Sequence, residues 1–396
     1  MLAREDFHHN FRFISLGCKL GYLPLKLDTQ NGNLGLLDSK WKKRFCSVLF
    51  AWNILHFTYI QLRLPYLLLT GAQISLLSLI WHFTLIVATA SLTFWHYTAF
   101  FAYPGITATC FNKAFDPWEC KHARTGPSSK INSGRGFWSL WNRLTLQEML
   151  TLVYPPGFTL TAVLVLALYC HEPELSSLLY SSLPKSMKTL GWFGLLLLQE
   201  ANLLLLELWS CSVTFTLHSL FPVTMNRAVL SVAFCTEQHC RTVGDGIRIV
   251  HEIRCIQLLV NMFNVGHKNV IYCIKLFCIV LAVVNGYVAI AHGGENKIFG
   301  LLTFCMLCDT MILYPLVYQK AFAIPVGVDR LKGDLRMKMR MCAGNAGMGA
   351  RAVEMQVRSI PSVGLRVGDF HVLERLSTPI FIDYVIRNIV NLLVMT

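Results

Sequence analysis

Two groups of cysteine and histidine residues have spacings that could hold a metal ion or form a redox pair. Cys305 and Cys308 are separated by two residues, which is the spacing of a redox or zinc site. They lie in the middle of an apolar stretch, where thiolates and hydrated ions are disfavoured, so we interpret them as ordinary thiols. The second group matches no known zinc spacing and consists of Cys235, His239, Cys240, His251 and Cys255. We therefore expect no bound metal and no cofactor.

Sequence motifs of common enzymes do not occur in the chain. There is no HExxH, no GxSxG and no glycine-rich nucleotide loop. Residues 341–351 hold three glycines, but they lack the Lys-Ser/Thr step and the preceding strand of a phosphate-binding loop. We interpret this segment as a flexible linker. The sequence gives no support for an enzyme.

Polar residues inside apolar stretches are a stronger functional signal, because hydrocarbon makes them costly. Those in the outer halves of the predicted membrane helices could line an outward-facing pocket for a small molecule. The candidates for such a pocket are Trp81, His82, Thr159, Glu200, Asn285, Tyr287 and Asp309. The alternative is that these side chains only bond one helix to another. Both interpretations remain open from the sequence.

The last apolar stretch, residues 372–395, carries a polar stripe. Four polar residues fall within an arc of about 60° on an α-helix: Ser377, Tyr384, Asn388 and Asn391. Asp383 and Arg387 flank this arc as an acid–base pair four residues apart, which partly offsets the cost of placing either charge in a membrane. The stripe either faces water on an axis shared by several subunits or packs on the other helices of its own chain.

The composition is that of a membrane protein. Of the 396 residues, 54% are hydrophobic and 14% are charged, whereas a soluble domain has about 25% charged residues. The net charge of +13 is the sign expected of basic cytosolic loops beside anionic lipid. We therefore expect membrane lipid as a partner and no nucleic acid. The first 44 residues are mixed and polar, so we expect no cleaved signal peptide.

Seven apolar stretches approach or exceed the ~20 residues that a membrane helix needs. They lie at 45–68, 73–101, 145–169, 190–222, 269–292, 299–325 and 372–395. Pro155 and Pro156 should kink or break the third helix unless neighbouring groups cover the carbonyls that they free. The fourth helix is expected to continue into a cytosolic helical platform within 225–268.

Lysine and arginine are distributed unevenly between alternate connections. The segments 1–44, 112–144, 225–268 and 326–367 hold 27 of them, whereas the other connections hold 3. The positive-inside rule then places the N-terminus in the cytosol and the C-terminus outside. We therefore predict an all-α, polytopic membrane protein with a cytosolic N-terminal segment, 1–44, and a seven-helix transmembrane domain, 45–396.

The layout and the C-terminal motif resemble the arthropod gustatory and odorant receptor superfamily. The local likeness begins at Val367-Gly-Asp-Phe-His-Val-Leu-Glu-Arg-Leu-Ser-Thr-Pro-Ile-Phe and continues at Asp383-Tyr384. The residues that match the family pattern are Gly368, Phe370, Glu374, Arg375, Ser377 and Tyr384. The sequence departs from the pattern at Asp383, where the family has threonine, and at Val390-Asn391, where it has Gln-Phe.

This resemblance implies a chemoreceptor of the plasma membrane that detects small-molecule tastants or odorants. Family members resemble ligand-gated, non-selective cation channels built from four identical or related subunits. The resemblance implies a ligand pocket in the outer half of each subunit and a tetramer anchor formed by 225–268 and 330–370. It also implies that the last helix lines the pore, with Ser377, Tyr384, Asn388 and Asn391 facing it.

Two other classes of seven-helix protein remain as alternatives. A G-protein-coupled receptor would need an external N-terminus, which the charge distribution opposes, and its Asp/Glu-Arg-Tyr and Asn-Pro-x-x-Tyr steps are missing. A secondary transporter could use Glu200, Glu207 or Asp309 for coupling ions. Such a transporter would be supported by inverted repeats with broken helices, and the sequence shows no repeat.

Overall fold

The computed structural model describes residues 4–71, 75–116, 144–174, 177–294 and 297–395, and most of these are helical. The long helices are α2 (Lys40–Leu69), α3 (Leu76–His96), α6 (Leu146–His171), α7 (Leu190–His239), α8 (Val243–Ala291), α9 (Lys297–Tyr318), α10 (Ile324–Ser359) and α11 (Ser377–Met395). The shorter helical segments are η1 (Glu5–Phe7), α1 (His8–Leu20), η2 (Tyr97–Ala102), α4 (Pro104–Phe115), η4 (Leu179–Ser182), η5 (Lys185–Met187) and η6 (Ala321–Ala323). The strands form two antiparallel pairs, β1 (Leu25–Asp28) with β2 (Asn33–Leu36) and β3 (Arg366–Val367) with β4 (His371–Val372).

Among the described residues, six helices are long and apolar enough to cross a membrane, or up to seven if one bent pair counts as a single span. The bent pair is α9 and the start of α10, which meet at 45°. Each of the seven predicted stretches overlaps one of these helices. The all-α polytopic fold predicted from composition and hydropathy is therefore confirmed.

The helices α7 and α8 are much longer than a bilayer requires, at 50 and 49 residues. At about 1.5 Å per residue each is about 75 Å long, whereas the hydrocarbon core is about 30 Å thick. The predicted loop at 225–268 is therefore the continuation of these two helices beyond the membrane, joined by a short turn. The fourth predicted span does continue as one helix to His239, and the cytosolic location of this extension stays a prediction.

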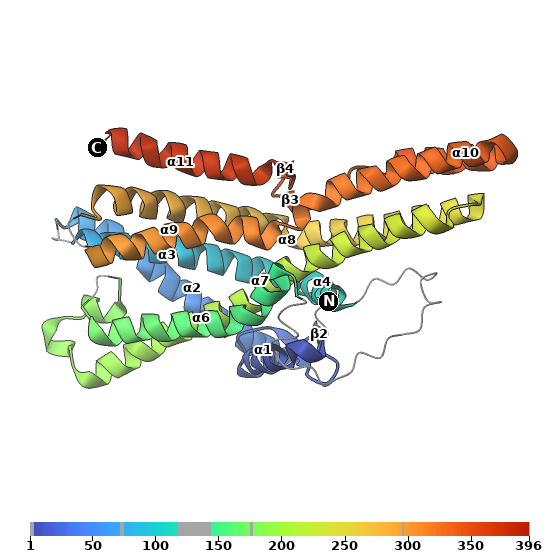
Figure 1. The fold of residues 1–396 in the computed structure, drawn as a ribbon. Helices are drawn as coiled ribbons and strands as arrows, with labels where there is room; N and C mark the ends of the chain where they lie inside the picture. Colours follow the sequence, from blue (N-terminus) through green and yellow to red (C-terminus); the bar gives the residue numbers. More distant parts are fainter. Residues whose placement is uncertain (1–3, 72–74, 117–143, 175–176, 295–296, 396) are drawn as a thin grey trace.

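The connections of the bundle alternate between its two ends. The C-terminus lies at the same end as the α2–α3, α6–α7 and α8–α9 connections, and the α7–α8 junction lies at the opposite end with the far tip of α10 (Figure 1). This alternation agrees with the two classes of connection that the lysine and arginine distribution separates. Most of the predicted cytosolic loop 112–144 lies outside the described residues.

The helix α7 forms the core of the bundle. Its most apolar stretch is 83% buried, whereas the corresponding stretches of α6 and α11 are 17% buried. It packs against α6, α4 and α10, while α8 packs against α3, α9, α10 and α11. The apolar surfaces of α6 and α11 are left uncovered by the chain itself, which is expected of helices that face lipid or another subunit.

The N-terminal segment folds against the core instead of trailing from it. The Trp209 indole N–H of α7 donates a 3.1 Å hydrogen bond to the carbonyl of Phe13 in α1. Gly17 allows this close approach, because a Cβ there would lie 2.5 Å from the Trp209 ring. The ring of Tyr22 stacks on Trp209 with centroids 4.8 Å apart. The segment is thereby fixed to the middle of α7.

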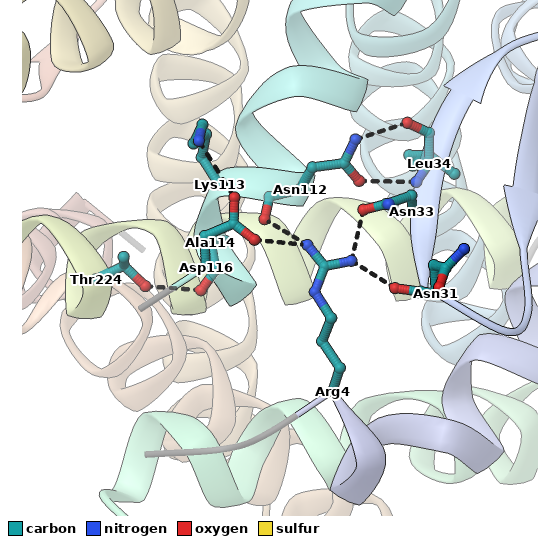
Figure 2. A network of polar contacts seen from close by, with 9 residues as sticks. All are labelled: Arg4, Asn31, Asn33, Leu34, Asn112, Lys113, Ala114, Asp116 and Thr224. Atoms are coloured by element: carbon teal, nitrogen blue, oxygen red, sulfur yellow. Dashed lines mark hydrogen bonds and ion pairs between the residues drawn. The ribbon is translucent and has the colours of Figure 1, made fainter. Parts of the chain in front are cut away.

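A single arginine fastens the β1–β2 hairpin to α4 (Figure 2). The Arg4 guanidinium donates a 2.6 Å hydrogen bond to the side-chain oxygen of Asn33. It donates another, of 2.8 Å, to a carboxylate oxygen of Asp116. Beside it, the side chain of Asn112 accepts from the Leu34 N–H at 2.7 Å and donates to the Leu34 carbonyl at 2.8 Å. The Asn112 amide thus completes the free backbone edge of β2 as another strand would.

The helix α10 folds back on itself near Gly347. This glycine has φ 35° and ψ −105°, which breaks the helical path. Arg340 lies 2.8 Å from Glu354, although 14 residues would separate them by about 21 Å in a straight helix. The interpretation of 341–351 as a flexible linker is therefore wrong. The glycine that argued for flexibility provides the backbone conformation that a turn between two helical arms requires.

Candidate ligand pocket and pore helix

One face of α11 packs against the bundle through three apolar residues one turn apart, Phe381, Val385 and Ile389, which are all buried. The Phe381 ring lies 5.2 Å from the ring of Tyr314 in α9. Ile389 fits against Gly286 of α8, where an added Cβ would lie 2.4 Å from the isoleucine side chain. The orientation of α11 about its own axis is fixed by these contacts.

The polar stripe therefore points away from the chain's own helices. Asp383, Tyr384, Arg387 and Asn391 are exposed, and Asn388 is half-buried at the edge of the packed face. The Arg387 Nε lies 2.9 Å from a carboxylate oxygen of Asp383. Packing of the stripe within its own bundle was one of the two sequence-based interpretations, and these side chains do not pack there.

Ser377 differs from the other candidates for a pore-facing role. It is buried at the first residue of α11, and its hydroxyl oxygen accepts a 3.0 Å hydrogen bond from the N–H of Glu374. The serine thus closes the turn that leads into the helix. Ser377 shares an angular sector with Tyr384, but it also lies one turn before the buried Phe381, at the edge of the packed face. Tyr384, Asn388 and Asn391 remain the candidates for pore-facing residues.

Of the seven candidate ligand residues, Glu200 lies in the most distinctive environment. Its carboxylate lies 3.2 Å from the His56 Nε2 of α2, and both side chains are almost fully buried. The backbone N–H of Leu179, in the α6–α7 connection, donates to the other carboxylate oxygen at 3.2 Å. With Tyr169, Tyr180 and other apolar side chains, Glu200 lines a small cavity beneath this connection. The carboxylate therefore links α2 and α7 with the α6–α7 connection.

The other candidates bond mainly to their own or neighbouring helices. The His82 Nε2 lies 2.9 Å from the carbonyl of Ile60 in α2. Thr159 and Asn285 donate to carbonyls one turn earlier in their own helices, at 2.7 and 2.8 Å. For these three residues the structure favours the helix-bonding interpretation. The remaining three, Trp81, Tyr287 and Asp309, lie on α3, α8 and α9 and do not line that cavity.

Sequence reasoning missed the polar residues of α2 that meet α7. The Asn202 amide donates to the side-chain oxygen of Asn53 at 3.2 Å, and the Tyr22 hydroxyl donates to Asn202 at 2.9 Å. One turn further along, the Gln199 amide lies 3.3 Å from the His56 Nδ1. The signal was available in Asn53 and His56, because both are polar residues inside the first apolar stretch.

A second polar chain that the sequence did not predict crosses the middle of the bundle. The His218 Nδ1 of α7 lies 2.6 Å from the Tyr318 hydroxyl of α9, and its Nε2 lies 3.2 Å from the His267 Nδ1 of α8. The His267 Nε2 lies 3.3 Å from the Thr107 hydroxyl of α4, which donates to the Ala99 carbonyl at 2.5 Å. The four side chains are fully buried. A neutral imidazole has one donor and one acceptor, so the protons along this chain must be arranged together.

This buried chain also reaches α11. The Tyr318 ring lies 5.2 Å from the Tyr314 ring, and Tyr314 lies 5.2 Å from Phe381. Packed rings and hydrogen bonds thus connect the π-helical turn η2, through four helices, with the base of the last helix. Such a contiguous network is a physical route by which a shift in one helix displaces another.

The similarity of this chain to known proteins lies in its fold. Neither the known family models nor the curated protein sequences match the chain. Among solved structures, the insect olfactory receptor OR5 from Machilis hrabei in complex with eugenol is similar with a TM-score of 0.67 and 9% identity, over 99% of this chain and 100% of that chain. A second structure of OR5 is similar with a TM-score of 0.64 and 10% identity over the same shares.

The bundle therefore has the same fold as these solved structures, with α11 as its last helix. In particular, the chain has the fold of an insect olfactory receptor over its whole length. The resemblance to the arthropod gustatory and odorant receptor superfamily is confirmed at the level of the fold.

Proposed function

We propose that this protein is a chemosensory receptor of the plasma membrane and forms one subunit of a ligand-gated, non-selective cation channel. The observation that carries the proposal is the orientation of α11. Its apolar ridge holds it to the bundle, while Asp383, Tyr384, Arg387 and Asn391 are exposed on a single chain. A charge at the centre of a bilayer costs about 2.5–3.5 kcal/mol even on the lenient insertion scale, so contact with water or another subunit is favoured.

An arrangement of four copies around one axis explains why α11 has one apolar face packed on the bundle and one exposed polar stripe. Tyr384, Asn388 and Asn391 then line a water-filled path, and the Asp383–Arg387 pair lies at its edge, where mutual neutralisation reduces the repulsion of cations. The α10 hairpin and the inner ends of α7 and α8 form the contact between subunits. The N-terminus is cytosolic and the C-terminus extracellular, as the lysine and arginine distribution indicates.

The ligand in this proposal is a small organic molecule, a tastant or an odorant. OR5 was determined in complex with eugenol, a small molecule, and its fold extends over the whole of this chain. The candidates that remain for contact with such a ligand are Trp81 of α3, Glu200 of α7, Tyr287 of α8 and Asp309 of α9. The Glu200 cavity beneath the α6–α7 connection is one place where an outer loop and the bundle meet.

Expression of the chain in a cell without native chemoreceptors tests the proposal. A panel of small volatile and soluble molecules is applied during whole-cell recording. We expect an active compound to evoke a current that reverses near 0 mV, because a non-selective pore passes both Na⁺ and K⁺. Saturable uptake without a matching current, or a response that depends on GTP, would contradict the channel assignment.

A further inference from the structure

A cavity of about 540 Å³ lies where α7, the α9–α10 bend and the segment before α11 meet. Three cationic side chains from separate parts of the chain line it, namely Lys320, Arg330 and Arg375. Apolar side chains, among them Leu230 and Val326, form part of its wall. We call it the basic cavity. It lies apart from Glu200 and from the polar stripe of α11.

Within the described residues, no acidic side chain pairs with the cations of the basic cavity. In the described part of the chain, no ion pair involves Lys320, Arg330 or Arg375. The acidic residue nearest in sequence to Arg330 is Asp329, and its carboxylate lies 3.3 Å from the Lys332 ammonium instead. Three unneutralised cations around one hollow attract an anion that carries more than one negative charge.

The position and the wall of the cavity indicate where this anion comes from. Arg375 lies two residues before the start of α11, so the cavity is level with the end of a membrane helix. Leu230 is 60% exposed and Val326 is 55% exposed beside the cations. Contact with apolar side chains does not stabilise a soluble anion, whereas the acyl chains of a lipid can lie against them. Basic pockets at the cytosolic ends of membrane helices are known to hold lipid headgroups.

We propose that the basic cavity binds the phosphorylated headgroup of an anionic phospholipid. The phosphate groups contact Lys320, Arg330 and Arg375, and the acyl chains follow Leu230 and Val326 towards the membrane. The bound lipid joins α7, the start of α10 and the segment that leads into α11. It therefore stabilises one position of the last helix relative to the bundle. Binding itself does not depend on the proposed channel activity.

Native mass spectrometry of the detergent-solubilised full chain tests this assignment. The probes are dioctanoyl phosphatidylinositol 4,5-bisphosphate, dioctanoyl phosphatidylcholine and free inositol 1,4,5-trisphosphate. We expect saturable binding of the anionic lipid, weaker binding of the free headgroup and no specific binding of the zwitterionic lipid. Arg330→Gln with Arg375→Gln should weaken lipid binding about 30-fold, since each cation near anionic lipid contributes a factor of about 5.

Two controls separate headgroup binding from damage to the fold. Arg330→Lys with Arg375→Lys keeps both charges and should retain most of the affinity. Arg351→Gln removes an exposed charge from the other arm of α10, outside the cavity, and should leave binding within about twofold. Each variant must keep the thermal unfolding midpoint of the unaltered protein within a few degrees.

The proposal is overturned if the double glutamine variant binds the lipid as tightly as the unaltered chain, or if Arg351→Gln weakens binding equally. Equal binding of phosphatidylcholine would also overturn it. If the free headgroup binds as tightly as the lipid, the source of the anion is soluble and the lipid assignment is wrong. If the oligomer of the double variant falls apart in lipid-free detergent while that of the unaltered chain does not, the cavity is instead an interface between copies of the chain.

Discussion

The Asn10 amide donates a 3.1 Å hydrogen bond to the carbonyl of Thr151, and this is the carbonyl that Pro155 leaves without a helical donor. Asn10 belongs to α1 and is buried, so an N-terminal side chain repairs a proline site in the third membrane helix. As a result α6 continues from Leu146 to His171 through both prolines. From the sequence, the third helix is expected to continue through Pro155 and Pro156 only if neighbouring groups cover the carbonyls that the prolines free. Asn10 does this for Pro155.

Replacement of Asn10 should therefore destabilise the protein through α6. Asn10→Ala leaves a buried carbonyl without a donor, at a cost of about 1–3 kcal/mol. In a Pro155→Ala background the same change should cost at least about 1 kcal/mol less, because alanine restores the helical N–H. Thermal unfolding of the four purified proteins in a double-mutant cycle measures this difference. Equal costs in both backgrounds would show that Asn10 acts only by packing.

The exposed stripe of α11 should control ion permeation. Tyr384→Leu and Asn388→Leu should each change single-channel conductance or ion selectivity without removing the receptor from the cell surface. The matched control is Val390→Leu, an exposed apolar position on the same helix. Single-channel recording and surface labelling provide the two readouts. Unaltered conductance and selectivity in both polar variants would disprove the pore assignment.

Asp383 and Arg387 should behave as a pair. Asp383→Ala leaves an arginine unpaired within the membrane, whereas Asp383→Ala combined with Arg387→Ala removes both charges. We expect the single variant to assemble less well than the double variant, as measured by the fraction of oligomer on size-exclusion chromatography. If the two variants lose the same fraction, the 2.9 Å contact contributes nothing to assembly.

The buried chain through His218 should be sensitive to the loss of one member. His218→Phe leaves the Tyr318 hydroxyl and one His267 nitrogen without partners, at about 1–3 kcal/mol for each unpaired group. Removal of the Tyr318 hydroxyl by Tyr318→Phe in the same protein should recover part of this loss. Thermal unfolding of the single and double variants measures the recovery. Strictly additive losses would indicate that the 2.6 Å contact is not a functional hydrogen bond.

The contact between the two arms of α10 should weaken as the pH falls. Hydrogen bonds from Arg340 and then Arg358 hold the pKa of the Glu354 carboxyl below its ordinary value. A lowered pKa contributes stability that is present above the unfolded pKa and is lost as the pH falls through the folded pKa. The distance between spin labels on the two arms should therefore increase in acid below the usual glutamate range. In Glu354→Gln this distance should not depend on pH in that range.

The helices and their alternation were predictable because membrane insertion depends on apolar length and on basic residues, which are properties of single segments. The acid–base spacing of Asp383 and Arg387 was readable for the same reason, since it depends on one helix alone. Gly347 was misinterpreted because a glycine gives the same local signal in a linker as in a turn between packed arms. The two arms are held together by the Arg340–Glu354 contact within α10. Both also pack on Gly246 of α8, which is distant in sequence, through Met339 and Val353.

The sequence identifies the candidate ligand residues only as polar residues inside apolar stretches. Apolar context identifies His82 and Glu200 as unusual, but it cannot distinguish a side chain that bonds a neighbouring helix from one that lines a pocket. That distinction depends on which helices touch, and the Ile60 carbonyl and His56 are positions of α2 that no local pattern associates with α3 or α7. The His218–His267 contact was missed because His218 lies near the inner end of the fourth predicted span and His267 falls in the predicted loop 225–268, just before the fifth.

The oligomeric state of the purified full chain tests the account most directly. One copy has a mass of 44.8 kDa, and in the proposed channel other copies surround the exposed polar stripe of α11. Mass measurement of the protein in detergent or lipid nanodiscs should give four copies, with α11 cross-links between copies at Asn391→Cys. A monomer that still binds a small-molecule ligand would contradict the channel assignment, and the polar stripe of α11 would then need another explanation.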